Sequence, residues 1–160
     1  MRLSVIAVGR LKAGPEKTMA NDYLARAEAF GRKAGIARVA VSEFAESQGA
    51  TAALRIAEER RMMAGALPRR GFTVVLDERG KTMASEAFAH LLRRHLDDGT
   101  PEVSFVIGGP DGHAAETRSE AGLLLSLGAM TWPHRLVRVM LFEQIYRALT
   151  ILLAHPYHRS

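Results

Sequence analysis

The chain has 160 residues and contains no cysteine, which excludes disulfide frameworks, thiolate nucleophiles and cysteine-ligated zinc or iron–sulfur centres. A length of 160 fits one domain over residues 1–160, because domains commonly contain about 100–150 residues. A hydrophobic content of 48% with 24% charged residues is ordinary for a folded domain and argues against wholesale disorder.

Lysine and arginine number 22 against 17 aspartates and glutamates, which gives a net charge of +5 at pH 7. A solvated surface is the plainest explanation, but basic residues also favour a phosphate-bearing partner because they release counterions when they neutralise phosphates. The excess gathers in residues 131–160, which hold four arginines and three histidines against one acidic residue. The opening residues lack the layout of a secretory signal, so we expect a cytoplasmic protein.

Short apolar runs alternate with longer segments of helical periodicity. This pattern predicts strands over 2–8, 36–43, 72–77, 102–107 and 123–127, and helices over 15–34, 50–66, 85–95 and 134–153, with a short helical piece before the fifth strand. Ser85 is the expected cap of its helix, and residues 78–80 are expected to form a turn. Strands separated by helix-length segments are typical of an α/β fold with a mainly parallel sheet and helices on both faces. In the helix over 50–66, the expected buried residues are Leu54, Ile56, Met62 and Met63.

The last predicted helix is apolar on almost every side. A membrane span is disfavoured because Arg138, Glu143 and Arg147 lie within it, and each central charge costs about 2.5–3.5 kcal/mol on insertion scales. We therefore expect a core helix. It would be covered on most sides by its own chain alone, or by its own chain together with a second subunit. Arg138 lies on the apolar side, so it needs a partner or a site to face.

Two glycine-containing segments follow predicted strands. The segment GGPDG at 108–112 would let backbone N–H groups approach a ligand, although a tight turn is the simpler interpretation and the spacing fits neither a dinucleotide nor a P-loop motif. The segment LGAMTWPH at 127–134 forms a second candidate loop. Its Trp132 is either a stacking surface or, as the better interpretation of this residue alone, a core anchor.

The tail HPYHR at 155–159 places four functional side chains at a terminus that would ordinarily fray. Histidine and tyrosine can transfer protons, and arginine can bind a phosphate through two hydrogen bonds. An exposed tail without function is the plainer alternative, and a metal site formed with His134 is a weak one, so we expect no metal. From the residues alone, the sequence indicates a small basic α/β domain with a glycine-rich ligand loop.

Three segments of the sequence, taken together, give a more specific indication than any one of them alone. FVIGGPDG at 105–112, LSLGAMTWPHRLVRVMLFEQIYRA at 125–148 and HPYHR at 155–159 closely resemble the ribosomal RNA large subunit methyltransferase H family, the small pseudouridine N3-methyltransferases of the SPOUT superfamily. The opening RLSVIAVGRLK also resembles that family's start, so the likeness spans essentially the whole chain. The resemblance implies the SPOUT fold, a mainly parallel sheet with a C-terminal trefoil knot, which periodicity could not indicate.

The resemblance also implies S-adenosylmethionine (S-adenosyl-L-methionine) as the cofactor, bound without a metal in the loops of the knot. It implies a homodimer with the last helix in the interface, and 23S rRNA within the assembled ribosome as the partner. Carried over by position, the cofactor-binding residues are Leu76, Gly108, Leu127, Gly128, Ala129, Met130, Thr131 and Trp132. His113 departs from the family, in which an apolar residue is expected after the glycine turn.

The implied reaction is methylation of N3 of a pseudouridine in 23S rRNA. It needs the base held out of its stack and a group that takes or stabilises the N3 proton. The catalytic candidates are Tyr157, His158 and Arg159, from the same chain or across the dimer, with His155 and Arg138 as second choices. Two alternatives stay open: a SPOUT enzyme for a different RNA nucleotide, and a ribosome-binding factor of the same fold without catalysis.

Overall fold

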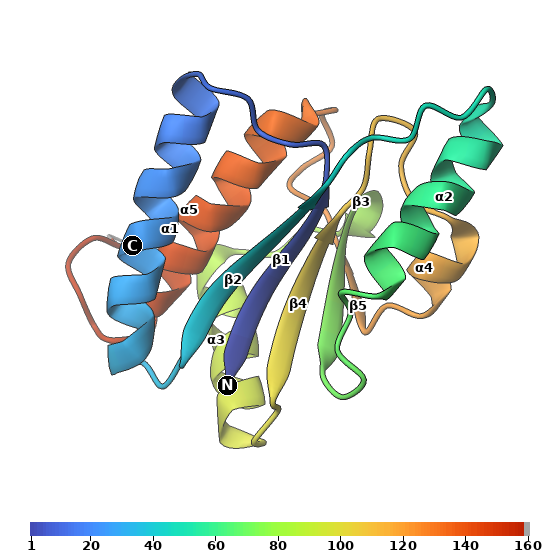
Figure 1. Ribbon diagram of the computed structural model, residues 1–160. Coiled ribbons are helices and arrows are strands. Elements are labelled where there is room, and N and C mark those ends of the chain that lie inside the picture. The colour runs from blue at the N-terminus through green and yellow to red at the C-terminus, as the bar shows by residue number, and fades with distance from the viewer. Residues whose placement is uncertain (159–160) are drawn as a thin grey trace.

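A five-stranded parallel sheet lies at the centre of the molecule in the computed structural model, which describes residues 1–158 (Figure 1). The strands follow the order β2-β1-β4-β3-β5, and each neighbouring pair is parallel, so their carboxyl ends meet at one edge of the sheet. The elements are β1 (Arg2–Val8), α1 (Pro15–Lys33), β2 (Arg38–Phe44), α2 (Ala52–Ala64), β3 (Phe72–Lys81), α3 (Ser85–Asp97), β4 (Glu102–Ile107), α4 (Ala115–Ser119), β5 (Leu123–Leu125) and α5 (His134–Leu152).

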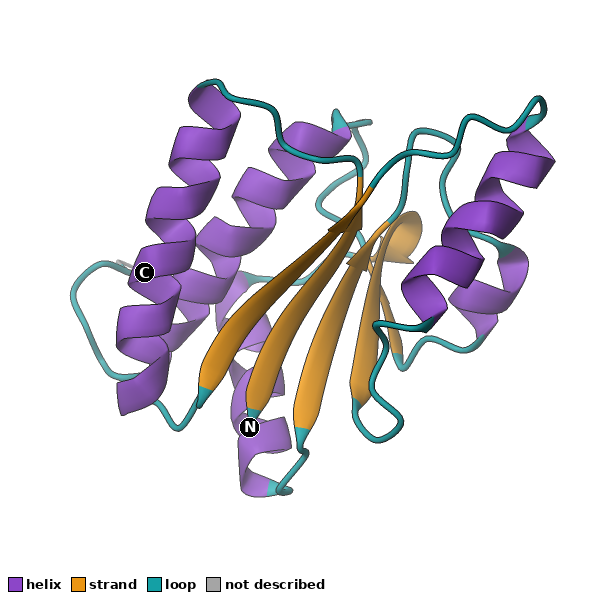
Figure 2. Ribbon diagram, in the orientation of Figure 1, coloured by secondary structure: helices purple, strands orange, loops and turns teal. Residues whose placement is uncertain are grey.

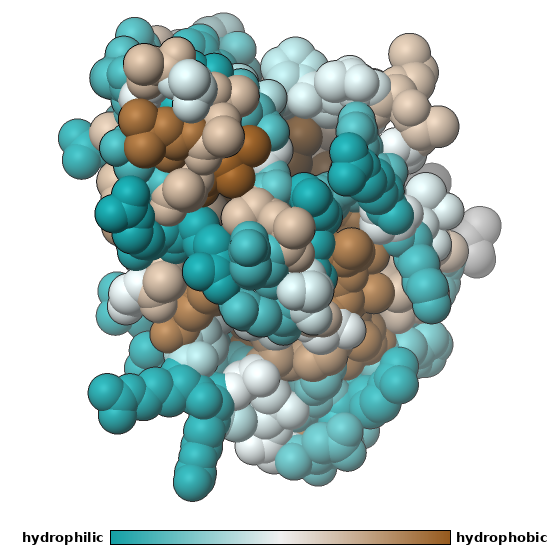
Figure 3. Space-filling model, turned by 90° about the vertical axis from the view of Figure 1, so that its right-hand side faces the viewer, coloured by the Kyte–Doolittle hydropathy of each residue, from teal (hydrophilic) through white to brown (hydrophobic). Residues whose placement is uncertain are grey.

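Helices cover both faces of the sheet, as predicted (Figure 2). On one face, α1, α3 and α5 pack over the larger apolar core, which includes Val5, Phe105 and Leu149. On the other face, α2 and α4 cover a smaller cluster that includes Ile6, Met63 and Val106. Seen from the side of α2 and α4, the surface is mostly hydrophilic and is interrupted by apolar patches (Figure 3).

The second helix differs from its predicted packing. Of its four expected buried residues only Met63 is buried, whereas Leu54 is 42% exposed and Met62 is exposed as well. A carboxylate, Glu59, takes an inward position instead and is 2% exposed. The apolar pattern placed Met63 correctly but Leu54 and Met62 wrongly, because the inner side of α2 meets polar loops as well as the sheet.

Two local predictions around β3 and α3 are wrong. Residues 78–80 form no turn, because β3 continues to Lys81 across an irregularity in its pairing with β5. Gly80 makes this possible, since a Cβ there would lie 2.6 Å from the carbonyl carbon of Leu124. The cap of α3 is Ala84 rather than Ser85, because the Ser85 hydroxyl donates to the Gln144 side chain at 2.8 Å instead.

Helix α5 is a core helix, as predicted, and it packs against both α1 and α3. Its Arg138 is 1% exposed and has the partners that its position requires: the guanidinium donates to the Glu43 carboxylate and to the Gly9 carbonyl oxygen. No helix in residues 1–158 combines the length and the apolar character that a membrane crossing needs. The trefoil knot stays a prediction.

Candidate active site

A cavity of about 280 Å³ opens at the carboxyl ends of β3, β4 and β5. Its walls come from residues 76–79 within β3, residues 107–113 at and after the end of β4, and residues 125–128 and 130–132 at and after the end of β5. The start of α5 closes one side through His134 and Val137. Open α/β sheets bind ligands at this edge, and the mixture of apolar side chains and turn backbone suits a small organic molecule.

The cavity gathers seven of the eight residues that the family resemblance assigns to the cofactor. Ala129 lies in the same loop but does not line the cavity. Trp132 is 39% exposed and forms part of the wall, so its interpretation as a core anchor is wrong. The seven residues are Leu76, Gly108, Leu127, Gly128, Met130, Thr131 and Trp132.

His113 joins the ends of β3 and β4 beneath the cavity. The Gly108 N–H donates to Nε2 of His113 at 3.1 Å, and the Leu76 carbonyl oxygen lies 3.1 Å from the same nitrogen. Burial lowers the pKa of His113, so the imidazole is neutral at pH 7. Its Nδ1 is buried without a hydrogen-bonding partner among the described residues. The sequence showed this histidine only as a departure from the family.

Glycines give a ligand room at two points of the wall. A Cβ at Gly108 would lie 2.9 Å from Cε1 of His113, so only glycine fits there without displacing the imidazole. Gly128 has a φ of +128°, and its N–H donates to the Ser126 hydroxyl at 3.2 Å. The cavity wall therefore combines glycine turns with apolar side chains, and this lining fits an adenosine-containing cofactor.

Acidic side chains also line the cavity, among them Asp77, Glu78 and Asp111. Asp77 lies 3.8 Å from the Arg118 guanidinium, and its side chain is largely buried. Arg118 also donates to the His113 carbonyl oxygen, which ties α4 to the glycine turn. Arginine side chains line the same wall, so the cavity carries charges of both signs. No sequence signal marked Asp77 or Arg118, because the fold alone brings them together.

The described part of the predicted catalytic tail, residues 155–158, does not line this cavity in its own chain. Tyr157 donates a hydrogen bond to Glu143 on α5 at 3.1 Å, and the Arg147 guanidinium lies 5.0 Å from the centre of the Tyr157 ring. His158 contacts Glu86 on α3 at 2.8 Å. Burial, together with Tyr23 and Glu143, raises the pKa of the Tyr157 phenol. In Figure 1 the red segment that follows α5 passes beside α1.

The other catalytic candidates are also apart from the cavity. The ring of His155 meets Phe30 edge-on, with 5.0 Å between the ring centres. Arg138 lines a different hollow, beside Arg10 and Leu11. Arg159 lies outside the described residues. In residues 1–158, no three histidine, aspartate or glutamate side chains are grouped so that they could hold a metal ion.

Comparison with known proteins decides the family. The family model described as predicted SPOUT methyltransferase matches residues 1–158. The chain belongs to the SPOUT methyltransferase family. Its enzymatic class is therefore methyltransferase, and its methyl donor is S-adenosylmethionine.

Relatives of the chain are similar over their whole length. Ribosomal RNA large subunit methyltransferase H of Rhodopseudomonas palustris (strain HaA2) is 54% identical over 160 residues and covers 100% of both chains. The protein of the same name from Brucella anthropi is 49% identical, again over 100% of both chains.

Two solved structures share the fold. A probable methylase family protein from Haemophilus influenzae Rd KW20 has a TM-score of 0.54 at 10% identity, over 99% of this chain and 70% of that chain. A probable methyltransferase from Bordetella pertussis Tohama I has a TM-score of 0.52 at 14% identity, over 92% of this chain and 95% of that chain. At these identities the likeness concerns the fold alone.

Proposed function

We propose that this SPOUT protein methylates N3 of a pseudouridine in 23S rRNA of the assembled ribosome. The observation that carries the proposal is the cavity at the ends of β3, β4 and β5, which gathers seven of the residues assigned to the cofactor. The names of the relatives that are about half identical over their full length support an rRNA substrate. The N3 position and the assembled state of the ribosome rest on the family resemblance.

S-adenosylmethionine would supply an electrophilic methyl group on a positively charged sulfur. Leu76, Leu127 and Trp132 would hold its adenine against apolar surface, while the turn at Gly108 offers backbone groups at close range. Fixing the methyl donor in one orientation is the main contribution that such a rigid wall can make to transfer.

We assign removal of the N3 proton to the tail, with Tyr157, His158 and Arg159 as first candidates. Transfer forms a bond from N3 to the methyl carbon and breaks the carbon–sulfur bond, and the N3 proton passes to a basic group. Because Tyr157 and His158 contact their own α5 and α3 and do not line their own cavity, supply of the tail across a homodimer is favoured. A groove of about 550 Å³ beside α5, lined by Met19, Met83 and Met140, supports a dimer on this face.

The test is methyl transfer from labelled S-adenosylmethionine to assembled ribosomes that lack the modification, with free rRNA in parallel. The product nucleoside is identified by mass, and light scattering gives the oligomeric state of the enzyme. We expect a methylated pseudouridine on assembled ribosomes only, made by a dimer.

Other results would overturn specific parts of the proposal. Label in another nucleoside would keep the methyltransferase and change its substrate. Binding of ribosomes and cofactor without transfer would favour a ribosome-binding factor.

A further inference from the structure

Helix α2 holds the turn that follows β4, although the helix itself does not line the cavity. This turn consists of residues 108–112, and its glycines and Asp111 form part of the cavity wall. Its own hydrogen bonds are few: the Gly112 N–H donates to the Gly109 carbonyl at 3.0 Å, and Gly112 adopts a φ of +82°. The shape of a glycine-rich turn of this kind depends on what surrounds it.

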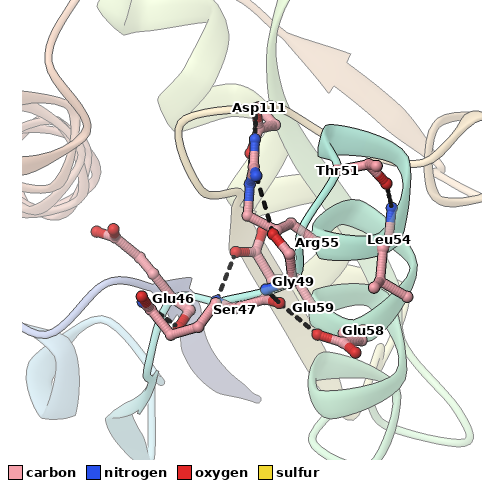
Figure 4. A network of polar contacts seen from close by, with 10 residues as sticks. Glu46, Ser47, Gly49, Thr51, Leu54, Arg55, Glu58, Glu59 and Asp111 are labelled. Atoms are coloured by element: carbon pink, nitrogen blue, oxygen red, sulfur yellow. Dashed lines mark hydrogen bonds and ion pairs between the residues drawn. The ribbon is translucent and has the colours of Figure 1, made fainter.

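Arg55 of α2 clamps the turn through a two-point contact (Figure 4). Its Nε donates to Asp111 Oδ2 at 2.7 Å, and its Nη2 donates to Asp111 Oδ1 at 3.0 Å. The remaining Nη1 donates to the Gly49 carbonyl at 3.0 Å, in the loop before α2. Hydrogen bonding from Arg55 lowers the pKa of Asp111, which keeps the carboxylate charged. A forked contact of this kind fixes orientation as well as distance.

Glu59, one turn further along α2, lies behind the turn. It is 2% exposed, and its Oε1 accepts from the Ser47 N–H at 3.1 Å. Its Oε2 has no hydrogen-bonding partner among the described residues, and a Cβ built at Gly109 would lie 2.7 Å from it. Glu59 therefore limits how far the turn can move toward α2.

We propose that Arg55 and Glu59 are positioning residues for S-adenosylmethionine, which act by holding the turn at 108–112 in its ligand-binding shape. The inference rests on the proposed cofactor site. A partly buried ion pair is a poor source of stability, because the desolvation of its charges offsets the attraction between them. Its geometry, by contrast, fixes the part of the wall to which Asp111 and Gly109 belong.

Helix α2 offers a matched control. Arg60 pairs with Glu120 at 2.8 Å, so it too joins α2 to the segment after β4. This pair is more exposed, makes one contact rather than two, and involves no residue that lines the cavity. Removal of Arg60 shows how much an arginine of α2 contributes to the fold alone. Removal of Arg55 includes the same contribution and, in addition, the effect on the turn at 108–112.

The experiment measures binding of S-adenosylhomocysteine, the demethylated product, by titration calorimetry, together with Tm. For Arg55→Ala we expect Kd to rise about tenfold or more, as loss of a charge-assisted hydrogen bond implies. Arg55→Lys keeps the charge but loses the fork, and we expect an intermediate Kd. Glu59→Ala should raise Kd as well, whereas Arg60→Ala should leave Kd within about twofold of the unsubstituted protein, a change smaller than one lost hydrogen bond would cause.

A double-mutant cycle separates positioning from folding. If Arg55 acts through the turn, then Arg55→Ala combined with Asp111→Ala should weaken binding no more than the stronger single substitution does. Equal Kd values for Arg55→Ala, Arg60→Ala and the unsubstituted protein would overturn the inference. Failure of the unsubstituted protein to bind the product would instead overturn the proposed cofactor site.

Discussion

The two faces of the sheet are held by different kinds of contact. The face under α1, α3 and α5 is a continuous apolar core with Val5, Phe105 and Leu149 at its centre. The face under α2 and α4 has a small apolar cluster and a large share of polar contacts. There the Ser4 and Ser104 hydroxyls lie 2.9 Å apart, and Arg55 and Glu59 hold the loops around α2.

The two kinds of contact therefore differ in effect: one stabilises the fold, and the other fixes the position of a loop. Apolar contacts contribute most of the free energy of folding but have no direction, so they hold a layer without fixing a loop. Hydrogen-bonded charges contribute little net stability and depend strongly on geometry. The cavity lies at the edge of the sheet, where the apolar layer and the polar layer meet, and its glycine turn is anchored from the polar side.

The largest effect on stability is expected from the apolar face. Phe105→Ala should reduce the free energy of unfolding by about 3–5 kcal/mol, because it leaves a cavity in a close-packed core. Val106→Ala, one residue along on the other face, should cost about 1.6 kcal/mol, or two methylene equivalents at about 0.8 kcal/mol each. Urea unfolding measures both values. Equal losses would show that the smaller cluster is as important for stability as the larger one.

Arg138 is an exception within the apolar face, and its replacement tests whether it is structural or catalytic. Arg138→Met should cost up to about 3 kcal/mol, since it removes the charged partner of the partly exposed Glu43 carboxylate and the donor to the Gly9 carbonyl. The double variant Arg138→Met with Glu43→Leu should recover much of that loss. A variant of normal Tm that lost only turnover would instead support the catalytic role that the sequence suggested.

Sequence reasoning was most reliable where one physical signal dominates. The bounds of β1 and β4 are as predicted because both strands are buried on two sides and are mainly apolar in sequence. The partner of Arg138 could be expected, although not named, because a buried charge requires one. The loop at 127–134 was a candidate from its residue types, whereas the cofactor-binding role of its residues came from the family resemblance.

Contacts between residues that lie far apart in the sequence could not be predicted. Arg55 and Asp111 are 56 positions apart, and neither carries a local signal of the other. Glu59 carries no local signal of burial, and the apolar pattern of α2 placed Leu54 and Met62 inward although both are exposed. The bend in β3 was missed because Glu78, Arg79 and Gly80 have the composition of a turn, whereas Gly80 lies against the backbone of β5.

His113 predicts a dependence of stability on pH. Burial places its pKa in the folded state below the ordinary value of 6.5, so the unfolded chain takes up a proton first as the pH falls. The stability that the neutral imidazole provides is present above pH 6.5 and is lost as the pH falls through that value toward the folded pKa. The stability advantage over His113→Leu should therefore be smaller at pH 5 than at pH 7.

Urea unfolding of both proteins at pH 7, 6 and 5 checks this prediction. His95 also has a lowered pKa because of burial, but it is present in both proteins and cancels in the difference. Parallel curves for the two proteins would mean that His113 titrates alike in the folded and the unfolded chain. In that case the imidazole would not be the buried link between β3 and β4 that the contacts with Leu76 and Gly108 indicate.

The smallest effect on stability is expected at the tail, where the effect on activity should be large. His158→Ala removes an exposed contact with Glu86, so it should cost less than about 1 kcal/mol of stability and leave product binding unchanged. If the imidazole takes the N3 proton, turnover on ribosomes should fall about 10²–10⁴-fold. Normal turnover would remove His158 from the mechanism.

Glu86→Ala is the matched control, because it frees the tail from α3 while it keeps the imidazole. A loss of turnover in His158→Ala alone assigns the effect to the imidazole. Equal losses in both variants assign it to docking of the tail on its own chain. Faster turnover in Glu86→Ala would mean that the docked tail seen here must leave α3 before it can serve a cavity, as supply across a dimer requires.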